Sequence, residues 1–144
     1  MNLYHTPDVQ FFLPDELQDR SILAFAVPTS SDPNGAGSFS FVVTRHVTTR
    51  PTTPLAHANQ VLEELPRVLS DYRLIERASL TLDGRAAERI EFAWDSNGEP
   101  MQQQQTFVSV QGGLLTLTAT ATVPLFEDHR PLLQRLVLGF KFLR

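Results

Sequence analysis

The fold is decided by YRLIERASLTLDGRAAERIEFAWDSNGEPMQQQQTFVSVQGGLLTLTATATV, residues 72–123. Four runs within it read as β-strands, and short turn signals separate them: Asp83-Gly84, Asn97-Gly98 and Gln111-Gly112-Gly113. Asp-Gly and Asn-Gly dipeptides between strands indicate tight hairpins, because these residues tolerate positive φ. The segment therefore predicts an antiparallel sheet. Its expected strands are Tyr72–Leu82, Arg85–Asp95, Met101–Val110 and Leu114–Val123.

Side-chain alternation predicts what each face of these strands carries. Ile90, Phe92 and Trp94 fall on one face of their strand, with Arg89 and Glu91 opposite. In the last strand, an apolar set is expected to face away from a threonine set. The apolar set is Leu115, Leu117, Ala119 and Ala121, and the threonines are Thr116, Thr118, Thr120 and Thr122.

The flanking sequence adds further strands and two helices. The expected strands are Val9–Leu13, Ser21–Val27 and Ser38–Val47, and the turn-rich stretch Thr29–Gly37 is expected to be a loop. Thr53-Pro54 is a signal for the start of a helix, and apolar residues then recur at helical spacing: Leu55, Ala58, Leu62, Leu65 and Leu69. This helix should end or kink near Pro66. A last helix is expected over Arg130–Leu138, with Gly139 as its stop. The predicted fold class is α+β, an antiparallel β-sheet with helices packed on one face.

Composition limits the class of protein. The chain has 144 residues, which indicates a single domain over residues 1–144, since domains average about 150 residues. Hydrophobic residues make up 42% and charged residues 19%, which excludes a wholly disordered chain. The net charge is −4 and Lys141 is the one lysine, so the basic stripe of a nucleic-acid binder is missing.

The sequence has no cysteine, which excludes disulfides, thiolate metal sites, a cysteine nucleophile and a lipid-modified cysteine. The N-terminal MNLYHTPDVQFFLPDE lacks the basic and apolar regions of a signal peptide. No apolar run approaches the roughly 18 residues that a membrane span needs. We therefore expect a cytoplasmic protein that does not insert into a membrane.

No catalytic, metal or cofactor site is expected. The four histidines, His5, His46, His57 and His129, are scattered, and none lies at ligand spacing from another. Nucleophile-elbow, P-loop and dinucleotide-binding motifs are absent. Adjacent acids such as Glu127-Asp128 are interpreted as charged surface. The protein is therefore expected not to be an enzyme.

Some strand faces carry apolar or small uncharged residues where an open sheet would usually carry lysine or glutamate. Met101, Gln103 and Gln105 share one face of their strand, and SILAFAV (residues 21–27) is apolar on both faces. Ser38, Ser40, Val42 and Thr44 also share a face. Either these strands are buried on both faces, or the face is an ordinary threonine-rich surface, or it is an interaction surface.

The chain resembles the Eag-type chaperones of bacterial type VI secretion, within the wider DcrB-like group. The resemblance rests on short matches in the family's order along most of the chain. They are Leu3-Tyr4, Leu13-Pro14-Asp15, residues 18–22 (QDRSI), residues 40–45 (SFVVTR), residues 84–87 (GRAA), Phe92-Ala93-Trp94 and Gln105-Thr106-Phe107. The resemblance implies a PsbP-like α+β fold and a homodimer. It also implies that the protein keeps the N-terminal transmembrane helices of a secreted toxin, an Rhs or PAAR-bearing effector, soluble before export.

The resemblance further implies an effector-binding surface on a sheet face of aliphatic and small polar residues. By position these are Ile22 and Ala24 as aliphatic contacts, Ser40, Thr44 and Gln105 as polar contacts, Met101 and Gln103 on the same strand face, and Gln60 on the helix.

Two alternatives remain open from the sequence. One is a non-catalytic homodimeric structural or assembly subunit, in which the apolar sheet face is only the dimer interface. The other is a small-ligand binder or enzyme with a cleft in the sheet, although no convergent set of polar groups is visible.

Overall fold

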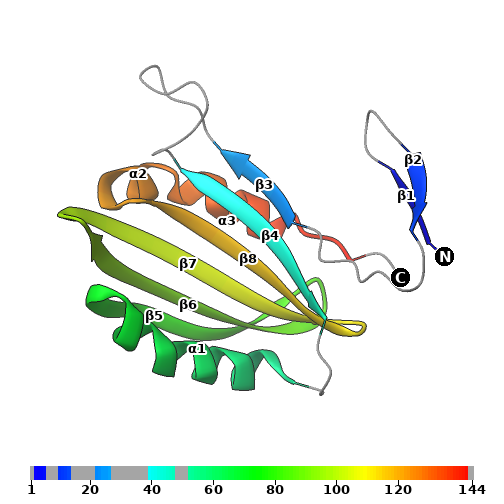
Figure 1. Cartoon of the computed structure of the whole chain (residues 1–144), viewed down its shortest axis with the longest axis horizontal. Coiled ribbons are helices and arrows are strands. Elements are labelled where there is room, and N and C mark those ends of the chain that lie inside the picture. The colour runs from blue at the N-terminus through cyan, green and yellow to red at the C-terminus, as the bar shows by residue number, and fades with distance from the viewer. Residues whose placement is uncertain (1, 6–9, 14–21, 27–38, 48–51, 143–144) are drawn as a thin grey trace.

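The computed structural model describes residues 2–5, 10–13, 22–26, 39–47 and 52–142. Its centre is a six-stranded antiparallel sheet with strand order β3-β4-β8-β7-β6-β5, shown in Figure 1. The strands of this sheet are β3 (Ile22–Ala26), β4 (Ser40–Val47), β5 (Ser70–Leu82), β6 (Arg85–Ser96), β7 (Glu99–Val110) and β8 (Gly113–Thr122). A separate hairpin pairs β1 (Asn2–His5) with β2 (Gln10–Leu13).

The predicted hairpin turns set the register of half the sheet. Asp83 and Gly84 have φ values of 46° and 81°, and Asn97 and Gly98 have 53° and 89°. Two consecutive residues at positive φ define the tight turn that matches the twist of paired strands. The Asn97-Gly98 turn pairs Ser96 with Glu99 and thereby aligns all of β6 with β7. The hairpins expected from the sequence are confirmed.

Helix α1 (Pro54–Val68) begins at its predicted cap, where the Thr53 hydroxyl accepts a hydrogen bond from the Ala56 amide at 3.0 Å. Pro66 lies in its last turn, so the helix ends two residues later. The apolar side of α1 packs over β5, β6 and β7. Fully buried residues of this contact are Ala58, Ile90, Phe92 and Phe107.

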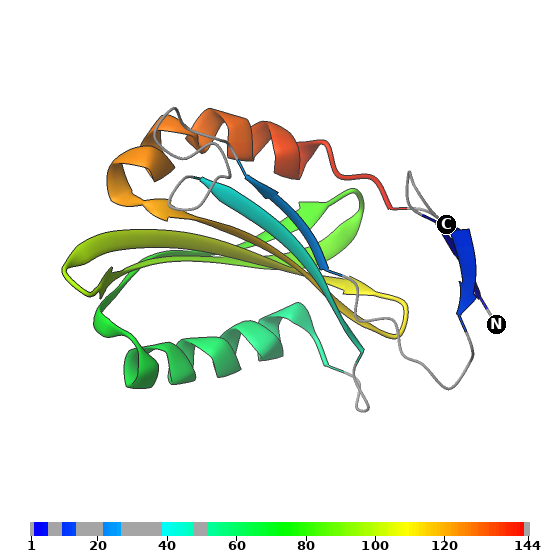
Figure 2. The ribbon, with the colours of Figure 1, turned by 45° about the horizontal axis from the view of Figure 1, so that its top comes forward.

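Helices α2 (Val123–Asp128) and α3 (Arg130–Leu138) cover the opposite face of the sheet, as Figure 2 shows. Their apolar residues complete the larger core. That core contains Phe39, Phe41, Val43, Leu82, Ala87, Val108, Leu117, Ala119, Ala121, Phe126, Leu133 and Val137.

The α+β class with an antiparallel sheet is confirmed, but the placement of all helices on one face is wrong. Strand β6 explains the difference, because it is buried on both faces: Ile90 and Phe92 lie under α1, and Ala87 and Glu91 lie on the side of α2 and α3. The sequence also missed β1 and α2, and it placed Val123 in a strand, whereas it begins α2. The loop expected at Thr29–Gly37 lies entirely outside the described residues.

Candidate functional site: the open face of the sheet

The two faces of β4, β8 and β7 differ in burial. On the side of α2 and α3, Phe41, Ala119 and Gln102 are all buried. On the other side, Val42, Thr118 and Thr120 are only half-buried, although Phe107, Leu114 and Thr116 further along β7 and β8 are buried. The main contacts of α1 with the sheet are to β5, β6 and β7. We call the partly exposed surface the open face. Its members are Ala24, Ser40, Val42, Thr44, Met101, Gln103, Gln105, Thr118, Thr120 and Thr122.

Strand register brings the open face together from segments far apart in the chain. Ser40 pairs with Thr120, and Thr120 pairs with Gln103 on its other side. Two residues further along β4, Val42 pairs with Thr118, and Thr118 pairs with Gln105. Because paired residues in an antiparallel sheet share a face, these rows form one continuous surface.

Hydrogen bonds link the polar side chains of the open face into a chain. Gln105 Nε2 donates to Gln103 Oε1 at 2.6 Å, and Gln103 Nε2 donates to Thr120 Oγ1 at 2.9 Å. Ser40 Oγ donates to the Thr120 carbonyl at 3.4 Å. The amides and hydroxyls hold each other in place on the sheet. They form a polar stripe beside the apolar side chains of Val42 and Met101.

Most predicted contact residues meet on this face. Ala24, which is exposed, and the half-buried Ser40, Thr44, Met101, Gln103 and Gln105 all belong to it. Ile22 pairs with Thr44, which places its backbone in the same row, while its side chain lies outside the described residues.

Gln60 does not join the open face. It is exposed on α1, and its Nε2 lies 3.5 Å from Glu64 Oε1. The buried position Ala58 lies about 200° away around the helix, so Gln60 faces outward from the sheet. Val61, its neighbour, packs instead into the core under α1.

The open face offers hydrogen-bonding groups and apolar side chains and carries no charge. Every described side chain on it is uncharged, and its donors and acceptors are hydroxyls and carboxamides. None of these groups has the acid, base or nucleophile pairing that catalysis needs. Among the described residues, no cluster of three metal-ligating side chains occurs, and no helix has the length and hydropathy to cross a membrane.

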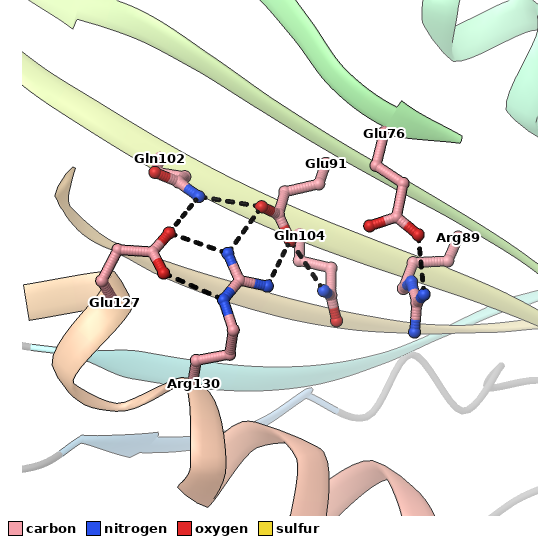
Figure 3. A network of polar contacts seen from close by, with 7 residues as sticks. All are labelled: Glu76, Arg89, Glu91, Gln102, Gln104, Glu127 and Arg130. Carbon is pink, nitrogen blue, oxygen red and sulfur yellow. Dashed lines mark hydrogen bonds and ion pairs between the residues drawn. The ribbon is translucent and has the colours of Figure 1, made fainter. Parts of the chain in front are cut away.

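The opposite face holds a buried polar network that sequence reasoning missed (Figure 3). Arg130 at the start of α3 donates to both carboxylate oxygens of Glu91, at 3.1 and 2.8 Å, and to Glu127 at 2.9 and 3.1 Å. Gln102 and Gln104 also donate to Glu91, at 2.8 and 2.9 Å. Glu91 is 1% exposed, so this network fastens α2 and α3 to the sheet.

Charge and hydrogen bonding in this network favour its ionised form. Burial by itself raises the pKa of Glu91, but bonds from Arg130, Gln104 and Gln102 outweigh it and hold that pKa below the ordinary value. The bond from Arg130 likewise lowers the pKa of Glu127, and the two carboxylates raise the pKa of Arg130. One contact of this network could have been predicted from the sequence, because the Asn97-Gly98 turn places Glu91 opposite Gln104.

Comparisons with known proteins agree with this architecture. The chain is 27% identical over 131 residues to "Effector EagT6" of Pseudomonas aeruginosa, a match that covers 91% of this chain and 89% of that protein. The crystal structure of PA94 from Pseudomonas aeruginosa, described as a protein of unknown function, superposes with a TM-score of 0.84 at 24% identity. That match covers 100% of this chain and 98% of the other.

The solution structure of the PsbP protein CyanoP from Synechocystis sp. PCC 6803 matches with a TM-score of 0.55 at 12% identity, over 99% of this chain and 92% of the other. The PsbP-like fold expected from the sequence is therefore confirmed. The resemblance to Eag-type proteins is confirmed by the similarity to EagT6. The DcrB family model matches residues 9–138, which is most of the chain. This protein belongs to the DcrB family.

Proposed function

We propose that this protein is a type VI secretion chaperone. It binds the N-terminal transmembrane helices of a cognate Rhs or PAAR-type effector and shields them in the cytoplasm until export. The observation that carries the proposal is the open face, an uncharged surface of mixed apolar and small polar side chains that stays partly exposed. The similarity to EagT6 supports an effector-associated role. The role is binding, without catalysis.

The physical requirement is to cover apolar side chains. A transmembrane helix satisfies its own backbone hydrogen bonds, so its cost in water comes from exposed apolar surface. Removing about 100 Å² of apolar surface from water stabilises the complex by about 2.5 kcal/mol. Val42, Met101 and Ala24 supply apolar contacts for this purpose. The small threonine side chains let a helix approach the sheet closely.

The polar stripe adds a second kind of contact. Transmembrane helices pack through small residues and carry serine, threonine or glycine on their packing faces. The hydroxyls of Thr118 and Thr120 and the carboxamide of Gln105 can bond to such residues or to exposed helix carbonyls. A purely apolar face would leave those groups unsatisfied at a cost of about 1–3 kcal/mol each.

A homodimer is part of the proposal. β3 is an edge strand, and on the side away from the open face its Leu23 and Phe25 are 56% and 59% exposed. Large exposed apolar side chains on an edge strand favour coverage by a second chain. A second copy there would let two subunits clasp opposite sides of the effector helices.

The test is co-expression with the N-terminal segment of an effector encoded beside this protein. Wild-type protein should keep the segment soluble and co-purify with it. Val42→Asp should weaken capture at least tenfold, because a charge on the open face would be desolvated against an apolar helix. Leu138→Asp is the matched control, since Leu138 is 78% exposed on α3 at the opposite face.

Thermal unfolding of each variant separates lost binding from lost folding. Thr118→Asp, which changes the side-chain volume little, provides a second charge on the same face if Val42→Asp unfolds. The proposal fails if the effector segment is equally soluble without this protein. It also fails if folded open-face variants capture the segment as well as wild type does.

A further inference from the structure

A cavity of about 340 Å³ lies on the face opposite the open face, between α3 and strands β5, β6 and β7. Its volume falls at the lower end of the range for small-molecule sites, about 300–1,000 Å³. Its lining combines five aliphatic residues with six polar or charged ones. The aliphatic residues are Leu80, Leu82, Leu133, Val137 and Leu138, and the polar or charged residues are Glu76, Thr81, Arg89, Gln104, Arg130 and Gln134.

Arg89 lines this cavity and has guanidinium N–H groups without a hydrogen-bond acceptor among the described residues. Its Nη2 donates to Glu76 Oε1 at 2.9 Å, while its Nε is buried without an acceptor. Within the described part of the chain, its Nη1 makes no hydrogen bond. Arg130 lines the same cavity, but Glu91 and Glu127 accept from all three of its guanidinium nitrogens, in four hydrogen bonds.

The Glu76 partner can be displaced. Its side chain is 45% exposed, so its carboxylate can turn into water at little cost, and exposed ion pairs of this kind are weak. Planar guanidinium groups favour carboxylates, which they bind through two donors at once. A ligand with a carboxylate at one end and a hydrocarbon chain at the other would match this lining. Its carboxylate would bind Arg89, and its chain would pack against Leu80, Leu133 and Val137.

We propose that this cavity binds a free aliphatic carboxylate, such as a medium-chain fatty acid. The carboxylate bonds to Arg89 in place of Glu76, and the hydrocarbon chain lies between α3 and the sheet. The site is on the opposite face from the proposed effector-binding surface and does not depend on that function.

The test is a titration of the ¹⁵N-labelled full chain with sodium octanoate, followed by amide chemical shifts. Octanoate should give saturable shifts in β6 and α3. 1-Octanol, which has the same chain without the charge, should bind at least tenfold more weakly. Arg89→Gln should weaken octanoate about tenfold and leave octanol binding unchanged, because it removes only the charged contact.

Two further variants make the result specific to the cavity. Gln134→Trp, at an exposed lining position of α3, should block octanoate by filling the space. Arg135→Gln, next to it and outside the lining, should bind as wild type does. Arg89→Lys, which keeps the charge and loses the planar fork, should bind with intermediate affinity and replaces Arg89→Gln if that variant unfolds.

The proposal is overturned if octanol binds as tightly as octanoate, if neither saturates at millimolar concentration, or if folded Arg89→Gln retains full affinity for octanoate. Effector capture by the open face would be unaffected by any of these results.

Discussion

Glu91 has the most constrained surroundings of any described acidic residue, because one buried carboxylate receives donors from Arg130, Gln102 and Gln104. Glu91→Gln keeps the size of the side chain but replaces an acceptor oxygen with an NH₂ group. That NH₂ group would face donors, and Arg130 would lose its buried partner. We expect the free energy of unfolding to fall by about 3 kcal/mol, measured by urea denaturation.

The matched control is Glu76→Gln, which removes a carboxylate from the pair with Arg89 on the same sheet face. Because that side chain is 45% exposed, its loss should cost less than about 1 kcal/mol. Equal losses for the two variants would contradict the role given to the buried network.

The same network predicts a pH dependence. The pKa of Glu91 in the folded protein lies below the ordinary value of 4.5 that the unfolded chain has. Its stabilising contribution is therefore complete above that value and is lost as the pH falls through the lowered folded-state pKa. The difference in unfolding free energy between wild type and Glu91→Gln should be constant near neutral pH and shrink in acid. A difference that grows on acidification would refute this assignment.

At the scale of elements, α1 is the wall beside the open face, and its first turn depends on Thr53. Thr53→Ala removes the acceptor for the Ala56 amide and should destabilise the protein by about 1 kcal/mol. Thr52→Ala changes the adjacent residue without touching the cap and should leave stability nearly unchanged. Thermal or urea unfolding of the two variants measures the difference in stability. Identical unfolding curves would show that the Thr53 cap does not stabilise the protein.

Local sequence signals predicted those elements whose cause is local. Asn97-Gly98 fixed a hairpin and its register, and Thr53-Pro54 fixed the start of α1. The last helix, Arg130–Leu138, was predicted with its observed bounds because Pro131 and Gly139 mark its ends. Each of these signals acts within a few residues, so no knowledge of the rest of the fold was needed.

The features that sequence could not supply depend on distant contacts. No turn links β4 to β8, so their pairing, which joins Ser40 to Thr120 and assembles the open face, followed only from the whole sheet. Alternation placed Glu91 on the polar face of β6, but its burial there depends on Arg130, 39 residues away, which supplies its partner.

At the scale of the molecule, the two faces of the sheet differ in how they are covered. One face is closed by α2 and α3 over a hydrophobic core and a buried ion-pair network. The other is half covered by α1 and ends in an uncharged surface. If the open face is a binding site, dimerisation must use another surface.

Sedimentation velocity distinguishes an open face that binds the effector from one that forms the subunit interface. Wild type and Val42→Asp should both sediment as dimers, with the dimer formed away from Val42. A wild-type dimer that Val42→Asp converts to monomers would show that the open face is itself the subunit interface. That result would favour the structural-subunit alternative.

The most direct measurement is photo-crosslinking of the complex formed on co-expression with the effector N-terminal segment. A photoreactive phenylalanine is placed at Val42 or Gln105 on the open face, and at the exposed Gln134 on α3 as the control. The account predicts crosslinks from Val42 and Gln105 to the apolar helices of the effector and none from Gln134. Crosslinks from Gln134 alone, with none from the open face, would contradict it.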